Sequence, residues 1–232
     1  MTTGIAITAV KRRPADLREF TIHELFEATV DDWSAIAFAA SVGLLPNSRT
    51  CERCKRKMHL VSRQENIDKK RWICKVSEGK KKKYCSTKSI RSGTFFEKSH
   101  LTVRTIVHVM YWWALDAPPT LIEPLCGVTA KTAADFNTFL RQECVKWYKG
   151  ERESLDVEEE ADGDQTATSS PSNTSGGSSG ASRWAEAKRK RSSVELETSA
   201  LLEKRFREDA DGAVFARITT AIGKSFNIES ML

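Results

Sequence analysis

The sequence predicts a small α+β fold, in which N-terminal helices, a ribbon of short antiparallel strands and a helix-turn-helix precede a disordered linker and a partly helical tail. Three observations predict it. Apolar residues recur at helical spacing before residue 49 and after residue 100, short β-like segments with four cysteines lie between, and the composition changes abruptly near Glu151. The 232 residues suffice for one ordinary domain with tails, or for two very small domains.

The first 48 residues divide into a flexible N-terminus, residues 1–20, and N-terminal helices, residues 21–48. Residues 1–20 have few apolar side chains and contain the basic cluster KRRP. Thr21 and Glu24 have the spacing of a capping box, which predicts a helix start. A second helix is predicted over residues 32–42, and its buried stripe would be Trp33, Ile36, Ala37 and Ala40.

Residues 49–100 have the pattern of a small antiparallel sheet. The segments KMHLVSR, RWICKV, STKSIRS and TFFE alternate with charged turns. Their apolar content is too low for a hydrophobic core of their own. The sheet is therefore expected to be held by something other than hydrophobic burial.

Four cysteines in this segment have the spacing of metal ligands: Cys51, Cys54, Cys74 and Cys85. Two residues separate the first pair, so a tight turn can direct both sulfurs at one ion, and a second pair from a neighbouring hairpin would complete a tetrahedron. We predict a structural Zn²⁺ at this site, which makes residues 49–100 a zinc ribbon. Metal binding would then supply free energy that the sparse core cannot.

Alternatives to this ligand set exist within the sequence. His59 or His100 could replace one cysteine, because ten residues separate Cys74 from Cys85 where most ribbons have two. Six cysteines in a chain without a recognisable secretory signal favour metal binding or free thiols over disulfides, in a reducing compartment. The two cysteines outside the ribbon, Cys126 and Cys144, lie on apolar helix faces and are expected to be buried thiols.

Residues 101–149 return to helical spacing. One apolar face comprises Val103, Ile106, Val107, Met110, Trp113 and Ala114. After Pro118 and Pro119, a short helix, a turn at Gly127 and a longer helix to about Tyr148 have the layout of a helix-turn-helix, whose second helix enters the major groove of DNA. The longer helix would bury Ala133, Phe136, Leu140, Cys144 and Trp147. An ordinary helical hairpin is the alternative.

The opposite face of the longer helix carries the candidate DNA contacts Thr129, Lys131, Thr132, Thr138 and Gln142. Lysine and hydroxyl groups suit phosphates, and glutamine suits adenine. Asp135 lies on the same face and would be unfavourable beside a phosphate.

Positive charge is concentrated in one part of the chain. The whole protein has a net charge of +6, whereas residues 49–104 contain 18 basic and 5 acidic residues. The ribbon residues Lys80, Lys81, Lys82, Lys83, Lys88 and Arg91 are therefore predicted to contact the phosphates of double-stranded DNA. A merely solvated loop is the alternative.

From residue 150 the sequence changes character. Residues 150–182 form an acidic and then Ser/Gly-rich stretch, which predicts a disordered linker. Residues 183–232 form a basic, partly helical tail, with an amphipathic end that suggests self-association. Its cluster Lys188, Arg189, Lys190 and Arg191 predicts nuclear import if the source is eukaryotic, and a cytoplasmic location otherwise. No apolar run approaches a membrane span, so no membrane partner is expected.

The order of the segments GLLPNSRTCERCKRKMHL, RWICK, CSTKSIRSGTFFEKSHLTVRTIVHVMYWWA and LCGVTAKTAADFNTFLRQEC resembles the N-terminal region of Merlin-type and ISXO-like transposases. The match covers about residues 21–148, and SIRSGTFFE-x-S-x-L is its most specific part. The resemblance implies that the four ribbon cysteines bind zinc and that the helix pair recognises transposon-end DNA.

The chain departs from this family where the catalytic domain should begin. The family's DDE chemistry needs three carboxylates on an RNase-H-like sheet, where they hold two divalent metals. Here Asp156 and Glu158–Glu160 lie in a polar run without strand-forming residues, so we expect no catalytic residue and no enzyme activity. The sequence thus predicts a zinc-dependent DNA-binding module of a transposase type; a zinc-ribbon protein-interaction adaptor and the front half of a split active transposase are the alternatives.

Overall fold

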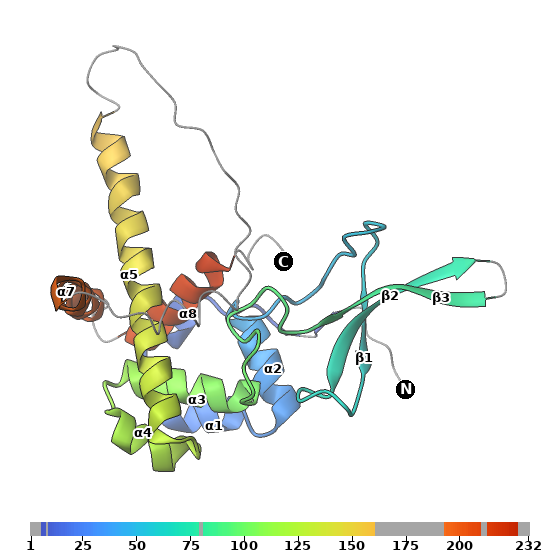
Figure 1. Cartoon of the computed structure of the whole chain (residues 1–232), viewed down its shortest axis with the longest axis horizontal. Helices are drawn as coiled ribbons and strands as arrows, with labels where there is room; N and C mark the ends of the chain where they lie inside the picture. Colours follow the sequence, from blue (N-terminus) through green and yellow to red (C-terminus); the bar gives the residue numbers. More distant parts are fainter. Residues whose placement is uncertain (1–5, 8, 79–80, 161–192, 210–212, 227–232) are drawn as a thin grey trace.

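The computed structural model describes residues 6–7, 9–78, 81–160, 193–209 and 213–226 (Figure 1). They form a mixed α+β fold, as predicted. In chain order the elements are η1 (Pro14–Leu17), α1 (Ile22–Ala28), α2 (Asp32–Ser41), β1 (His59–Ser62), β2 (Lys70–Glu78), β3 (Lys81–Ser89), α3 (Val103–Ala114), α4 (Pro119–Cys126), α5 (Ala130–Glu160), α7 (Ser193–Asp209) and α8 (Val214–Ser225). The helices gather on one side of the molecule, and the sheet extends away from them on the other (Figure 1).

The N-terminal segment packs on the helices, so the prediction of a flexible N-terminus is wrong for its described part. Ile7 and Leu17 are each only 3% exposed. The Ile7 amide donates a hydrogen bond to the Asn47 carbonyl at 2.8 Å. The ring of Phe20 stacks on Phe38 of α2 and on Phe215 of α8. These contacts join residues far apart in the chain, so the local composition of residues 1–20 gives no sign of them.

Helices α1 and α2 begin where capping residues predict. The Thr21 hydroxyl accepts a hydrogen bond from the Glu24 amide, and the Glu24 carboxylate accepts one from the Thr21 amide, which completes the capping box. In α2 the predicted stripe is only partly correct, because Trp33 remains 39% exposed. The buried residues are instead Ala35, Ile36, Phe38, Ala39, Ala40 and Ser41. A helix covered by neighbours on several sides has no single apolar stripe.

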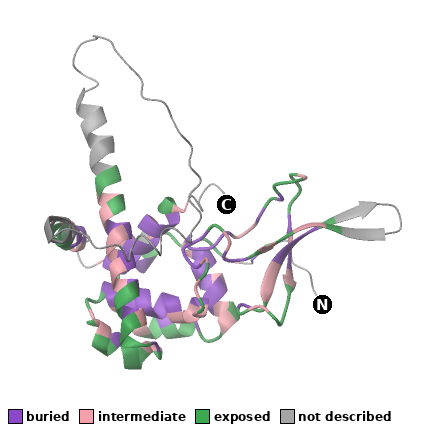
Figure 2. Ribbon diagram, viewed as in Figure 1, coloured by how far each residue is buried: buried purple, intermediate pink, exposed green. Residues whose placement is uncertain are grey.

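The sheet has the order β1-β2-β3, and both pairings are antiparallel. The segment TFFE does not form the fourth strand that its composition suggests. It lies in a series of turns, and Phe95 and Phe96 are buried in the common core. Trp72 of β2, fully buried, belongs to the same core, so the inner end of the sheet shares hydrophobic burial with the helices (Figure 2).

Helices α3, α4 and α5 follow the predicted layout at their N-terminal ends. The six predicted apolar residues of α3 are all buried. Gly127, at φ +62°, forms the left-handed turn between α4 and α5 that favours glycine. Helix α5 does not end near Tyr148 but continues to Glu160, so residues 150–160 of the predicted linker are helical; its residues 161–182 lie outside the described residues. Glutamate and leucine favour helix, and a single glycine at position 150 costs only about 1 kcal/mol.

The two C-terminal helices pack against the rest of the protein. Phe206 of α7 meets Trp147 of α5 edge to face at 5.5 Å between ring centroids. The apolar face of α8 is buried, including Phe215, Ile218 and Ile222. The tail is partly helical, as predicted, but the amphipathic face that suggested self-association is already covered within the chain.

Candidate metal centre and basic surface

The four ribbon cysteines converge on one point. The ligand atoms of Cys51, Cys54, Cys74 and Cys85 all lie within 4.8 Å of one another. The Cys51 and Cys85 sulfurs are 3.8 Å apart, and those of Cys54 and Cys74 are 3.3 Å apart. A tetrahedral ion bound at about 2.3 Å from each sulfur needs sulfurs about 3.8 Å apart. The cluster can therefore hold a metal ion, and neither His59 nor His100 belongs to it.

The first cysteine pair lies on a tight turn. The Lys55 amide donates to the Cys51 carbonyl at 2.8 Å, and the Cys51 amide donates to the Arg56 carbonyl at 2.8 Å. Lys55 adopts φ +58°, a left-handed conformation that few side chains other than glycine take. This backbone brings the Cys51 and Cys54 sulfurs to the same side, as the two-residue spacing predicts.

A β-bulge supplies the second pair. Cys74 of β2 pairs with Ser86 of β3, but the next β2 residue, Lys75, pairs with Tyr84. Cys85 is the extra residue between them. In a regular ladder Cys85 would lie opposite Lys75, with its side chain on the other face from Cys74. The bulge turns the Cys85 sulfur toward Cys74 and explains how a ten-residue spacing forms one site.

The surroundings of the cluster shift the pKa values of its thiols in opposite directions. A hydrogen bond with the Ser86 hydroxyl, 3.0 Å from the sulfur, lowers the pKa of Cys51 to about 6. Burial raises the pKa of Cys74 and that of Cys85 above the usual thiol value. The Cys51 thiolate therefore forms readily, whereas those of Cys74 and Cys85 need a cation. Four sulfur ligands leave a tetrahedral ion no open position, which is the arrangement of a structural site.

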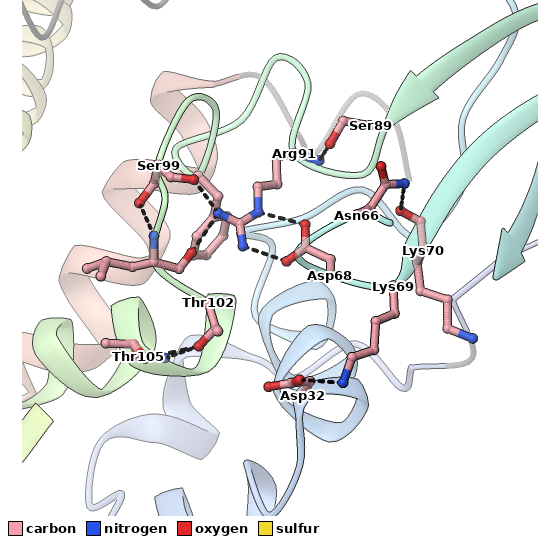
Figure 3. Close-up of polar contacts among 12 residues, drawn as sticks. Asp32, Asn66, Asp68, Lys69, Lys70, Ser89, Arg91, Ser99, Thr102 and Thr105 are labelled. Atoms are coloured by element: carbon pink, nitrogen blue, oxygen red, sulfur yellow. Dashed lines mark hydrogen bonds and ion pairs between the residues drawn. The ribbon is translucent and has the colours of Figure 1, made fainter. Parts of the chain in front are cut away.

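The predicted DNA contact Arg91 is not available to a partner (Figure 3). Its side chain is 5% exposed and forms a double ion pair with Asp68, at 2.7 and 2.5 Å. It also donates to the carbonyls of Ser99 and Leu101 at 2.9 and 2.7 Å. Arg91 therefore joins the ribbon to the start of α3, and its prediction as a phosphate contact is wrong. A buried guanidinium needs a carboxylate, and Asp68 lies 23 residues away in the chain.

The other predicted ribbon contacts have mixed outcomes. Lys88 is partly buried and pairs with Glu52. Lys81, Lys82 and Lys83 lie on β3 at the outer end of the sheet, opposite Glu78, Ser77 and Val76. Lys80 lies outside the described residues, as do Lys188, Arg189, Lys190 and Arg191.

On α5 the candidate contacts divide by exposure. Thr129 and Lys131 are exposed at the start of the helix, and the Thr129 hydroxyl accepts from the Thr132 amide at 3.2 Å. Thr138 is partly buried and donates to the Ala134 carbonyl. Gln142 is also partly buried, and its Nε2 atom is covered without a hydrogen-bond partner. Among these candidates, only those at the N-terminal end of the helix are therefore exposed to a ligand.

The cysteines outside the ribbon are buried to different degrees. Cys144 is fully buried and Cys126 partly, and burial raises the pKa of both thiols. Neither belongs to the four-sulfur cluster. Asp156 and Glu158–Glu160 fall on the last turns of α5, where the structure describes the backbone alone.

One group of basic residues was not among the predicted contacts. Arg53 lies between the first two cysteines, Lys55, Arg56 and Lys57 follow them before β1, and all four are exposed. The high positive charge of CERCKRK could have identified them in the sequence. The run of four lysines at 80–83 is the more conspicuous basic segment, and it was predicted instead.

Comparison of the chain with protein-family models, with curated proteins and with solved structures finds no significant match. Within the part of the chain that the structure describes, every helix is too short or too polar to cross a membrane.

Proposed function

We propose that this chain is a zinc-dependent DNA-binding module, similar to the DNA-recognition part of a cut-and-paste transposase and without its catalytic domain. The observation that carries the proposal is the four-sulfur cluster at the base of a basic ribbon. The ribbon is followed by a pair of helices that meet at a left-handed glycine turn. A metal ribbon and a helix-turn-helix in one chain are typical of proteins that bind nucleic acid.

Zinc is the metal that suits this donor set best. Four thiolates at the corners of a tetrahedron match its preferred ligands and geometry, whereas magnesium and calcium prefer oxygen. A bound zinc ion would fix the relative positions of the turn at 51–57 and the β2–β3 hairpin. The ion would have a structural role, because the protein occupies all four of its positions.

The DNA surface would include the start of α5. Thr129 and Lys131 are exposed there, and the first-turn amides of a helix attract phosphate. Ala130 and Ala134, also exposed, have small side chains that let the helix approach a groove closely. Asp135 on the same face disfavours a phosphate, so the contact would concentrate on the first turn.

The proposal is tested by zinc content and duplex binding of the full chain. We expect one zinc per chain and salt-sensitive binding to duplex DNA, and Cys54→Ser should abolish both, because three ligands hold the ion poorly. The matched control is Cys126→Ser, which lies outside the cluster and should retain both. A metal-free, fully folded chain, or one that ignores duplex DNA at low salt, would rule the proposal out.

A protein-interaction adaptor is a second candidate, favoured by exposed leucines. Leu121 and Leu125, one turn apart on α4, are 46% and 45% exposed, and Leu115 is 57% exposed. An adaptor would use such apolar side chains and would tolerate reversal of charge at Lys80–Lys83. The DNA-binding proposal instead predicts that this reversal lowers the affinity for DNA.

A further inference from the structure

We propose that residues 52–57, which we call the metal knuckle, form the main phosphate-binding surface of this protein for duplex DNA. The inference rests on the proposed DNA-binding function and assigns its principal electrostatic contact. The residues that carry it are Arg53, Lys55, Arg56 and Lys57.

The four knuckle cations are accessible to an anionic ligand. All four are exposed, and no ion pair joins any of them to an acidic residue in the described part of the chain. Arg53 donates one hydrogen bond, to the Cys85 carbonyl at 3.3 Å. Glu52, the acidic residue of the knuckle, pairs with Lys88 instead.

Other conspicuous basic residues of the ribbon have partners. Lys69 pairs with Asp32 at 3.5 Å, and the Lys70 ammonium lies 4.7 Å from the centre of the Trp33 ring. Lys88 and Arg91 pair with Glu52 and Asp68. A cation that already has a carboxylate partner must leave it before it can neutralise a phosphate, so the knuckle offers the less costly contact.

The knuckle backbone is held in place before any ligand arrives. Besides the two hydrogen bonds between Cys51 and residues 55 and 56, the Met58 amide donates to the Arg49 carbonyl at 2.7 Å. Thr50 and Lys57 form an isolated antiparallel bridge. A fixed backbone lowers the entropic cost of binding, so these cations can contribute more affinity than equal charges on an unrestrained loop.

The charge balance leaves the knuckle positive even when the site is filled. Four thiolates and one divalent ion carry a net double negative charge, which four cations exceed. The knuckle residues are polar apart from the metal ligand Cys54, whereas protein interfaces have an apolar centre depleted of lysine. The chemistry therefore favours the sugar-phosphate backbone over an acidic protein.

The test compares two triple variants of the full chain, each with three positive charges removed. The knuckle variant is Lys55→Gln, Arg56→Gln, Lys57→Gln. The control variant is Lys149→Gln, Arg205→Gln, Lys224→Gln, three exposed residues on the helical side of the protein. Affinity for a short fluorescent duplex is measured over a series of salt concentrations, and zinc content verifies that each variant is intact.

We expect the knuckle variant to lower the slope of log affinity against log salt by about 3, near one unit for each phosphate that is no longer neutralised. At moderate salt its affinity should fall by about tenfold or more, uniformly across DNA sequences. The control variant should keep nearly the wild-type slope, because its three positions lie outside the knuckle and outside the first turn of α5.

Each other outcome overturns the inference. Equal slopes of log affinity against log salt in the two variants, with the wild-type chain bound to DNA, would refute the knuckle as the main phosphate contact. The proposed DNA-binding function would then still stand. A wild-type chain that fails to bind DNA would refute both. Weaker binding of the knuckle variant to poly-glutamate, with duplex affinity unchanged, would assign this surface to acidic proteins.

Discussion

Gly223 of α8 packs directly against Gly43, at the turn that follows α2. A β-carbon added at Gly223 would lie 2.9 Å from the Gly43 carbonyl oxygen, closer than two such atoms approach in proteins. Gly43 has φ +77°, a left-handed conformation that favours glycine. The contact of these two glycines sets how closely the C-terminal tail approaches the N-terminal helices.

The substitution Gly223→Ala should therefore lower the free energy of unfolding by about 1 to 3 kcal/mol, the usual cost of overpacking. Urea denaturation followed by circular dichroism measures this. The control is Gly150→Ala in α5, where the added methyl group meets no atom within 4 Å and helix propensity improves by about 1 kcal/mol. Equal stability of the two variants would contradict a close tail contact.

Breaking the Arg91–Asp68 pair should be far more damaging than breaking a surface pair. Asp68→Asn leaves a buried guanidinium without its counter-charge, which costs about 3 to 5 kcal/mol. Lys69→Gln removes the exposed ion pair with Asp32 and should cost less than about 1 kcal/mol. Chemical denaturation of both variants decides the matter, and a small effect of Asp68→Asn would show that Arg91 does not brace the ribbon against α3.

Thiol reactivity should test the proposed metal site directly. In the native chain Cys144 is buried, and burial raises the pKa of the half-buried Cys126 to about 11, so both should react slowly at neutral pH. Removal of the ion by a chelator should release the four ribbon thiols together. Counting fast-reacting thiols before and after chelation measures this; ribbon thiols that already react fast in untreated, zinc-loaded protein would contradict their role as ligands.

His108 should make stability fall in mild acid. It lies 7% exposed on α3 with its Nε2 atom 2.7 Å from the Thr29 hydroxyl, and burial together with the charge of Arg104 lowers its pKa below 6.5. The folded state therefore binds this proton less readily than the unfolded state, so the stabilising contribution is present above pH 6.5 and is lost as the pH falls through the lowered pKa.

The measurement for His108 is the unfolding free energy of the wild type and of His108→Gln as a function of pH. The difference between the two proteins isolates the histidine from any effect of acid on the cysteines. His23→Gln is the control, since His23 lies on the exposed surface of α1. A difference between wild type and His108→Gln that stays constant from neutral to mildly acidic pH would be evidence against this role.

Several features could be predicted because their signals are local. The capping box at Thr21, the apolar face of α3 and the glycine turn before α5 each depend on residues within a few positions of one another. The first cysteine pair is of this kind as well. Its two-residue spacing alone indicates that both sulfurs can bind the same ion.

Other features depend on residues far apart in the chain. Three such features produce no recognisable pattern in the sequence. They are the ion pair of Arg91 with Asp68, the bulge that turns Cys85 toward Cys74, and the burial of α8 against the N-terminal segment. Sequence charge counts treat Arg91 and Arg56 alike, yet one is buried in an ion pair and the other is exposed.

The amino-acid sequence by itself determined the four cysteines that could hold a metal, the excess of positive charge on the ribbon and the beginnings of the main helices, because backbone propensity and short spacings act locally. Only the tertiary structure decided which cations remain open to solvent and how the tail closes on the core. The physical reason is that a charged side chain is either buried in an ion pair or exposed, according to the residues that pack against it. That packing depends on the whole chain.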